Sequence, residues 1–182
     1  MLNYPLVLML LTLSGTGIAQ NYTPTDEGSK VHFIIRNFGI NTGGDLQGLK
    51  GNIVFTPANL KTSDFNVSVE VKTIDTDIRS RDKDLRSGSY FDAEKFPLIT
   101  IQSTKIDKTN RTDSGWYYFT GTLTIHGVTK IILFPFTATL QGNDYLFSGK
   151  FDLNRLDFGV GESSSVLSKT VKVSLSVLAK KS

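Results

Sequence analysis

Apolar and polar residues alternate with a period of two along most of this chain. The stretch from Phe65 to Lys72 reads FNVSVEVK, and the stretch from Val171 to Val177 reads VKVSLSV. Because successive side chains of a β-strand point to opposite faces, this alternation predicts strands with one buried and one solvated face. Sheets with one solvated face are typically antiparallel. The pattern therefore indicates an all-β fold.

The alternating runs are separated by short turn-forming sequences such as NTGGD and QGND, and a polar leader, NYTPTDEGS, precedes the first run. Together they predict about eight strands joined largely by hairpins, which is typical of a barrel or a sandwich. Pro135 lacks a backbone N–H, so its strand is expected to be an edge or to be bulged there. The predicted strands lie near residues 30–38, 49–56, 63–73, 98–107, 115–125, 128–140, 144–153 and 169–180.

One long segment, residues 75–97, departs from the alternation. Its first part, DIRSRDKDLR, is polar and has no β-branched residue after Ile78. It therefore predicts about two or three helical turns inserted between the third and fourth strands. Its second part carries the aromatic residues Tyr90, Phe91 and Phe96. A charged helix with such flanks is either a solvated surface element or a cap that closes the mouth of a barrel.

The segment 1–19 predicts a cleaved signal peptide. The apolar run LVLMLLTL is followed by small residues, and Gly17 and Ala19 suit the two key positions of a cleavage site after Ala19. The run is shorter than the about 20 apolar residues that a transmembrane helix requires. A retained anchor is the alternative. The mature chain would be residues 20–182, which suits one domain, and we expect it to be periplasmic or secreted.

Composition and motifs argue against several classes of function. The chain has no Cys, which excludes thiol chemistry and Cys-based zinc sites. Its formal net charge is +3, and no basic cluster contains interleaved aromatics, so nucleic acid is not an expected partner. There is no G-x-S-x-G nucleophile motif, and the two histidines, His32 and His126, lie in separate strands or strand ends. Acidic residues in segment 75–97 alternate with Arg and Lys, which disfavours a calcium loop. We expect no enzyme activity, metal or cofactor.

The large aromatic residues of the strands leave two interpretations open. A barrel of about eight strands is either filled by its own side chains or holds one small ligand. In the first case the chain is a structural or interaction module without a ligand. In the second case it binds a ligand in its lumen.

Four blocks of sequence, in order along the chain, resemble the YceI-like family. RDKDLRSGSYFDAEKFPLITIQST (residues 81–104) is similar to the family's hallmark segment, and GTLTIHGVTKIILFPF (121–136) is similar to its Gly-x-Leu-Thr-Ile-x-Gly-Val-Thr strand pair. NRLDFGVG (154–161) resembles its Asn/Asp-Arg-x-x-Phe-Gly signature, and GLKGNIVFTPANL (48–60) resembles its early hairpin. The resemblance covers essentially the whole mature chain.

This resemblance implies a lipocalin-like antiparallel β-barrel, formed by residues 20–182, whose lumen binds a long isoprenoid or similar lipid without catalysis. A quinone or a polyprenyl chain would be such a lipid, held for transport, storage or protection. The segment 75–97 would be a cap beside the lumen. The expected partners are then this lipid and, transiently, a membrane, for a protein that is a monomer or a homodimer.

The resemblance assigns the residues that fix the cap and adds Phe91 and Phe96 beside the lumen, and the remaining candidates are large apolar residues that would either fill a core or line a lumen. The residues expected to fix the cap are Arg81, Asp82, Asp84 and Arg86. The residues expected to line the lumen or its cap are Phe33, Leu85, Phe91, Phe96, Trp116, Tyr118, Phe119, Phe134, Phe136 and Phe158.

Overall fold

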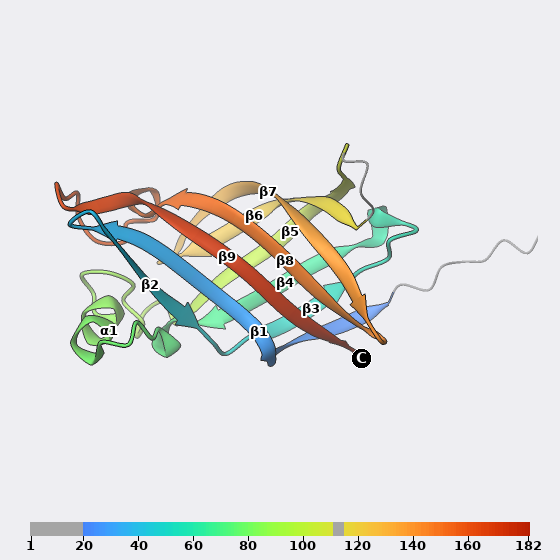
Figure 1. Ribbon diagram of the computed structural model, residues 1–182, viewed down its shortest axis with the longest axis horizontal. Coiled ribbons are helices and arrows are strands. Elements are labelled where there is room, and N and C mark those ends of the chain that lie inside the picture. Colours follow the sequence, from blue (N-terminus) through green and yellow to red (C-terminus); the bar gives the residue numbers. More distant parts are fainter. Residues whose placement is uncertain (1–19, 111–114) are drawn as a thin grey trace, which may run out of the picture.

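The sheet of this protein closes on itself into a barrel, which confirms the fold that the family resemblance implies. The computed structural model describes residues 20–110 and 115–182, and the expected signal peptide lies outside them. Nine strand segments in this part of the chain form one antiparallel sheet, in which the first and last segments pair with each other (Figure 1). The strands are β1 (Asn21–Asn37), β2 (Ile40–Leu46), β3 (Lys50–Val54), β4 (Asp64–Glu70), β5 (Leu98–Lys108), β6 (Trp116–Ile125), β7 (Val128–Gln141), β8 (Asp144–Asn154) and β9 (Leu167–Lys181). The helical elements are η1 (Leu60–Thr62), η2 (Val71–Thr73), α1 (Arg79–Arg86) and η3 (Arg155–Phe158).

Two of these segments share one position in the barrel. β2 pairs with the second half of β1, whereas β3 pairs with its beginning, at Asn21 and Tyr22. The closed barrel of the described residues therefore has the predicted eight positions, although it contains nine strand segments. The short helix α1 lies between β4 and β5, which confirms the predicted helical insertion.

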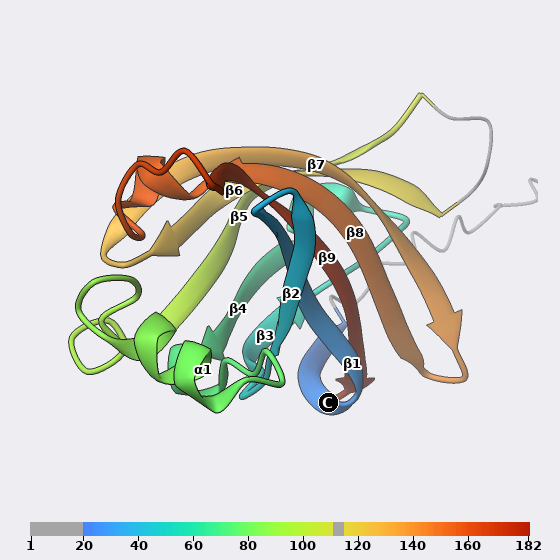
Figure 2. The ribbon, with the colours of Figure 1, turned by 60° about the vertical axis from the view of Figure 1, so that its left-hand side comes forward.

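The two ends of the barrel are built differently. The β1–β2 hairpin, α1, the β6–β7 turn and the loop before β9 lie at one end, called here the helix end (Figures 1 and 2). The η1 turn, the β7–β8 turn and the C-terminus lie at the other end, called here the plugged end.

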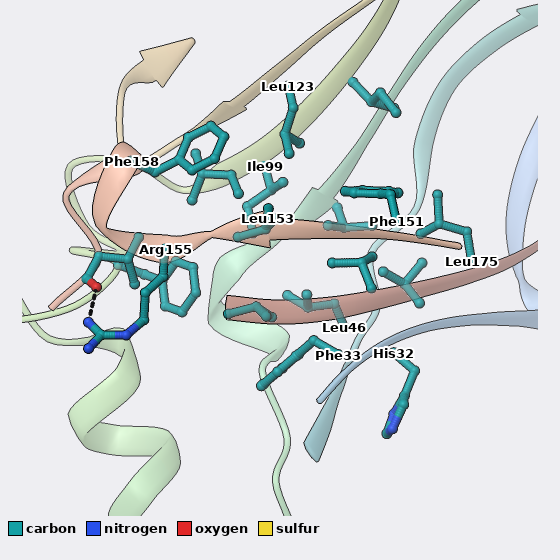
Figure 3. Close-up of a pocket in the computed structure, with 18 of the residues that line it drawn as sticks. His32, Phe33, Leu46, Ile99, Leu123, Phe151, Leu153, Arg155, Phe158 and Leu175 are labelled. Atoms are coloured by element: carbon teal, nitrogen blue, oxygen red, sulfur yellow. Dashed lines mark hydrogen bonds between the residues drawn. The ribbon is translucent and has the colours of Figure 1, made fainter. Parts of the chain in front are cut away.

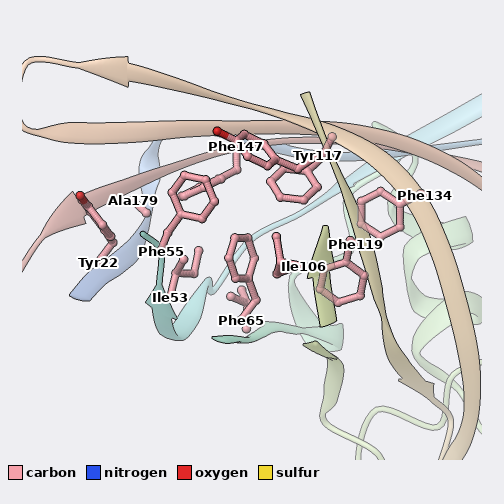
Figure 4. Close-up of a cluster of buried hydrophobic side chains, with 12 residues drawn as sticks. Tyr22, Ile53, Phe55, Phe65, Ile106, Tyr117, Phe119, Phe134, Phe147 and Ala179 are labelled. Atoms are coloured by element: carbon pink, nitrogen blue, oxygen red, sulfur yellow. The ribbon is translucent and has the colours of Figure 1, made fainter. Parts of the chain in front are cut away.

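Aromatic side chains fill the barrel at the plugged end (Figure 4). Phe55 is fully buried, and its ring packs edge-to-face against Phe65, Tyr117 and Phe147 at centroid distances of 6.0, 5.2 and 5.3 Å. Such pairs contribute about 0.5–1.5 kcal/mol each beyond the burial of their area. We call this cluster the aromatic plug; it consists of Tyr22, Ile53, Phe55, Phe65, Val67, Ile106, Tyr117, Phe119, Phe134, Phe136, Phe147 and Ala179.

Strand pairing separates at the helix end in two places. β7 pairs with β8 only from Phe136 onward, so that among the described strands the residues 128–135 pair with β6 alone. Pro135 lies in this stretch, which has a partner strand on one side only, and this confirms the predicted edge. On the other side of the barrel, β2 pairs with β1 but not with β4. The free edge of β2 instead lies beside the segment after β4, where Asp45 and Asp75 exchange two backbone hydrogen bonds of 2.8 and 3.1 Å.

Residues 71–97, which we call the cap, cover the second of these separations. The cap runs from η2 through α1 to the start of β5, and Figure 2 shows α1 at the edge of the barrel beside β2. Among the described residues, no helix combines the length and the apolar character that crossing a membrane requires.

Candidate functional site

The barrel is hollow between the aromatic plug and the cap. The cavity has a volume of about 460 Å³. Cavities of about 300–1,000 Å³ are typical of sites for small organic ligands. Figure 3 shows apolar side chains from several strands pointing into this space, among them Ile99, Leu123, Phe151 and Leu175. The site is therefore a space inside the fold and not a groove on its surface.

The floor of the cavity is the upper layer of the aromatic plug. Phe119 and Phe134 line the cavity, and their rings stack at 5.0 Å. Phe151 stacks on Phe134 at 4.8 Å and continues the wall toward the helix end. Phe55 and Tyr22 belong to the plug but not to the lining, so the cavity stops short of them. The plug thus closes the lumen at one end.

One face of β9 supplies much of the side wall. Val171, Val173, Leu175 and Val177 all line the cavity, and they are the residues whose alternation indicates this strand in the sequence. Val173 lies opposite Phe33 on β1 and Phe151 on β8, in the middle of the wall. The period of two therefore decides which side chains of the strand meet the lumen.

Polar groups gather at the helix end of the cavity. Ser80, Arg81, Asp84 and Arg155 line it there, while the deeper wall is largely aliphatic and aromatic. This distribution makes the site apolar along its length and polar at one end. Such a gradient suits a ligand that carries a polar group at the end of an apolar chain.

Arg155 is buried at the start of η3, with 4% of its surface exposed. Its guanidinium donates hydrogen bonds of 2.7 Å to the carbonyl oxygens of Val160 and Glu162, and its Nε donates to that of Ser168 at 3.0 Å; the dashed line in Figure 3 marks the Val160 bond. The Arg155 side chain thus fixes the loop between η3 and β9 through hydrogen bonds to backbone carbonyl groups. It also places a positive charge beside the cavity.

Hydrogen bonds to the backbone hold the cap in place. The buried carboxylate of Asp82 accepts bonds from the backbone N–H and the hydroxyl of Thr76, at 2.9 and 2.5 Å. Arg81 donates from Nε to the Thr76 hydroxyl and from Nη2 to the Thr76 carbonyl, and Arg86 donates to the carbonyl of Ile74. These contacts tie α1 to residues 74–76, in the segment between η2 and the helix.

The four residues assigned to the cap do not act as one group. Asp82, Arg81 and Arg86 bind the backbone or Thr76, and in the part of the chain that the structure describes they form no ion pair with one another. Asp84 is exposed and lines the rim of the cavity. The Nε of Arg86 is buried without a hydrogen-bond partner among the described residues.

Most of the candidate lining residues meet in the cavity although they come from distant parts of the chain. Seven of the ten line it: Phe33, Leu85, Phe91, Phe119, Phe134, Phe136 and Phe158. Leu85 and Phe91 come from the cap, and Phe158 comes from η3. The barrel therefore brings together side chains that the sequence separates by more than a hundred residues.

The other three candidates do not line the cavity, which corrects the assignment of Trp116 and Tyr118, whereas Phe96 belongs to the cap, just before β5. Tyr118 of β6 lies opposite Pro135 of β7. It is exposed on the outer face, because its neighbours Tyr117 and Phe119 point inward. Trp116 precedes Tyr117 and shares the outward face of the strand with Tyr118. Phe96 packs its ring against His126 at the β6–β7 turn, with centroids 4.8 Å apart.

The two histidines lie apart. His32 is among the residues that line the cavity, and its Nδ1 is 2.6 Å from a carboxylate oxygen of Asp45 (Figure 3). His126 has a positive φ of 50° in the β6–β7 turn. Among the described residues, no group of three or more His, Cys, Asp or Glu side chains is placed to hold a metal ion.

Several lining residues were not among the candidates. Ile99, Phe151 and Leu153 face the cavity from β5 and β8, and their alternation with polar neighbours is the signal that could have identified them. Arg155 lies in the NRLDFGVG block, but nothing in that sequence indicates that its charge is buried.

A closed antiparallel barrel around an apolar cavity defines the class of lipocalin-like binding barrels. A family model described as YceI-like domain matches residues 22–179, and the chain belongs to the YceI-like family. A UPF0312 protein of Yersinia pestis (strain Pestoides F) is 29% identical over 177 residues, which cover 92% of this chain and 90% of that protein. A UPF0312 protein of Yersinia enterocolitica serotype O:8 is similar to the same extent.

Solved structures share the fold. BcnA of Burkholderia cenocepacia matches with a TM-score of 0.77 at 23% identity, covering 84% of this chain and 96% of that chain. A YCEI protein of Campylobacter jejuni matches with a TM-score of 0.67 at 25% identity, covering 76% and 84%. A polyisoprenoid binding domain of Saccharophagus degradans matches with a TM-score of 0.71 at 15% identity, covering 88% and 98%.

Proposed function

We propose that this chain is an exported, non-enzymatic binding protein that holds a long isoprenoid or similar lipid, of the quinone or polyprenyl type, inside its barrel. The observation that carries the proposal is the cavity of about 460 Å³ with an aliphatic and aromatic wall. The protein would serve transport, storage or protection of this lipid. The binding described for the Saccharophagus degradans domain is in keeping with this ligand class.

The energetics of the site favour recognition of the tail over recognition of a head group. Burial of apolar carbon contributes about 0.8 kcal/mol per methylene, so one isoprene unit of five carbons contributes at most about 4 kcal/mol. An exposed ion pair with a charged head group contributes only about 0–1 kcal/mol. The tail would therefore determine affinity, and the polar rim around Arg81 and Asp84 would determine orientation.

Export of the chain is part of the proposal. Its support is the apolar run LVLMLLTL followed by a small-residue cleavage site. A lipid with a long apolar tail dissolves poorly in water, so a protein that carries it between membranes must cover the tail. A closed barrel covers an apolar chain on all sides.

Native mass spectrometry of the protein recovered from an exporting host tests the proposal, together with lipid extraction of the same sample. A bound, extractable long-chain lipid is the expected result. A sample that arrives empty is then offered isoprenoids in detergent. If these also fail to bind, the proposal is wrong, and the alternative of a structural or interaction module without a ligand takes its place.

A further inference from the structure

The tip of the β1–β2 hairpin exposes two large apolar side chains. Phe38, which follows the end of β1, is 73% exposed, and Ile40, the first residue of β2, is 70% exposed. The proposed function makes no use of either side chain. Their exposure costs solubility and gains nothing for the barrel core.

The backbone of this tip is unfavourable for a bulky residue. Phe38 has a φ of 48° and Gly39 has a φ of 78°, between the paired residues Asn37 and Ile40. Two consecutive residues with positive φ form a type I′ turn, in which Asn, Asp or Gly is normally found at the first position. An aromatic residue in the left-handed region is uncommon and strained. Strain of this kind in an exposed residue points to a role outside folding.

The tip adjoins the mouth of the lumen. The backbone N–H of Phe38 donates a hydrogen bond of 2.9 Å to the carbonyl of Val166, which is itself an exposed apolar residue of the loop before β9. The next residue, Leu167, lines both the lumen and a smaller pocket of about 320 Å³. The hairpin tip is therefore hydrogen-bonded to the loop whose next residue, Leu167, borders the cavity.

The smaller pocket gives this surface a basic and polar margin. Arg36 and Lys169 line it together with the serines 163–165. Glu162 is the acidic residue of the same loop. Exposed apolar side chains bordered by cations and hydroxyl groups are typical of surfaces that bind the interface of an anionic membrane.

We propose that the hairpin tip and the adjoining loop dock on the surface of an anionic lipid bilayer, with Phe38 and Ile40 inserted at the head-group level. Arg36 and Lys169 contact the lipid phosphates. The inference rests on the proposed function for its purpose, since an apolar ligand is dissolved in the bilayer and the tip places the mouth of the lumen against it. The occupant of this surface is the membrane and not a second copy of the chain.

Vesicle sedimentation tests this docking. The protein from the exporting host is mixed with vesicles of phosphatidylcholine alone or with added phosphatidylglycerol. The test variant is Phe38→Asn/Ile40→Thr, because Asn is favoured in a type I′ turn and Thr in a strand, so both substitutions suit the fold. The control is Leu140→Thr, which removes a 59% exposed side chain near the plugged end.

The parent and Leu140→Thr are expected to bind the anionic vesicles equally. The double variant is expected to bind at least about tenfold more weakly, because binding scales with the apolar area that inserts. Arg36→Gln/Lys169→Gln should bind anionic vesicles more weakly while leaving the weak binding to neutral vesicles unchanged.

Three results would overturn the docking: a parent that does not bind vesicles, a double variant that binds like the parent, or a parent dimer that the double variant converts to a monomer. Lipid loading from detergent is measured in parallel by native mass spectrometry. If the double variant loads normally, the lumen function stands whatever the vesicles show. If the parent neither carries a lipid when recovered from the host nor takes one up from detergent, the proposed function fails independently of docking.

Discussion

Tyr22 and Tyr117 place phenol groups in the aromatic plug. The Tyr22 hydroxyl donates a hydrogen bond of 2.6 Å to the side-chain oxygen of Gln20. Burial raises the pKa of both phenols above the ordinary value, and the neighbouring Tyr145 raises each further. Ionisation of either phenol would place a negative charge among aromatic rings, which the fold opposes.

These raised pKa values make the protein sensitive to alkali. Unfolded tyrosine ionises near pH 10, whereas the folded phenols keep their protons to higher pH. We therefore expect full stability from these groups below about pH 10 and a falling free energy of unfolding as pH rises above it. Tyr22→Phe should lessen this fall, as measured by urea unfolding from about pH 8 to about pH 11. Tyr118→Phe, on the outer face, is the control, and an equal fall in the Tyr22→Phe variant and the parent would contradict the expectation.

The sequence separates the two faces of β6 but does not indicate which of them points inward. The alternation separates Tyr117 and Phe119 from Trp116 and Tyr118, and the structure keeps these two sets on opposite faces. Both sets are aromatic, so hydrophobicity alone does not indicate which set faces the lumen. The neighbours in space decide it, and they come from strands that the sequence does not connect.

At the scale of elements, β2 is the strand that the sequence misses. Its residues Thr42, Gly43 and Gly44 read as a turn because they show no apolar alternation. A Cβ on Gly44 would lie 2.7 Å from the side chains of Phe33 and Thr76, and 2.8 Å from the carbonyl of Asp75. Gly44 is therefore needed for the close approach of the cap to β2. The two segments are apart in the sequence, so a local sequence pattern does not predict this contact.

The polar leader is the other error at this scale. Residues 21–29 belong to β1, and residues 21–25 pair with β3 or β9, although the segment reads as a tail before the first strand. This segment contributes Tyr22 to the plug. Pro24 and Gly28 are unfavourable in strands, so the residue types of the segment do not predict one. By contrast, the helical insertion is predictable, because charged residues without β-branching fill it.

Asp82 is expected to hold the cap closed. Hydrogen bonds to a charged group contribute about 1.5–3 kcal/mol, so Asp82→Asn should lower the free energy of local opening of the cap by about 1–2 kcal/mol. Hydrogen exchange of the amides in residues 74–86 measures this opening. Asp84→Asn, a change in the same turn at an exposed carboxylate, is the matched control. Equal exchange in the two variants would show that the Thr76 bonds do not hold the cap.

At the scale of the whole molecule, stability and binding can be tested separately, at a plug residue that lies outside the cavity lining and at a residue of the cavity wall. Phe55→Ala, in the plug, should lower the free energy of unfolding by about 3–5 kcal/mol and leave lipid loading of the folded protein unchanged. Val173→Trp, in the wall of the cavity, should abolish loading and change the free energy of unfolding by less than about 1.5 kcal/mol, because the added ring enters empty space. Urea unfolding and native mass spectrometry measure the two effects. Normal loading of Val173→Trp would place the ligand outside the cavity.

The aromatic plug closes one end of the lumen, so a ligand can enter and leave only at the other end. A chain that enters at the helix end cannot pass through the plug, so the distance from that end to the deepest lining residues, among them Phe65 and Phe147, limits the length of the buried tail. A ligand whose tail is longer than this distance must leave its remaining units outside the barrel, in contact with a membrane or a second protein. Exchange is then a single-entrance process, in which the last part of the tail to enter is the first to leave.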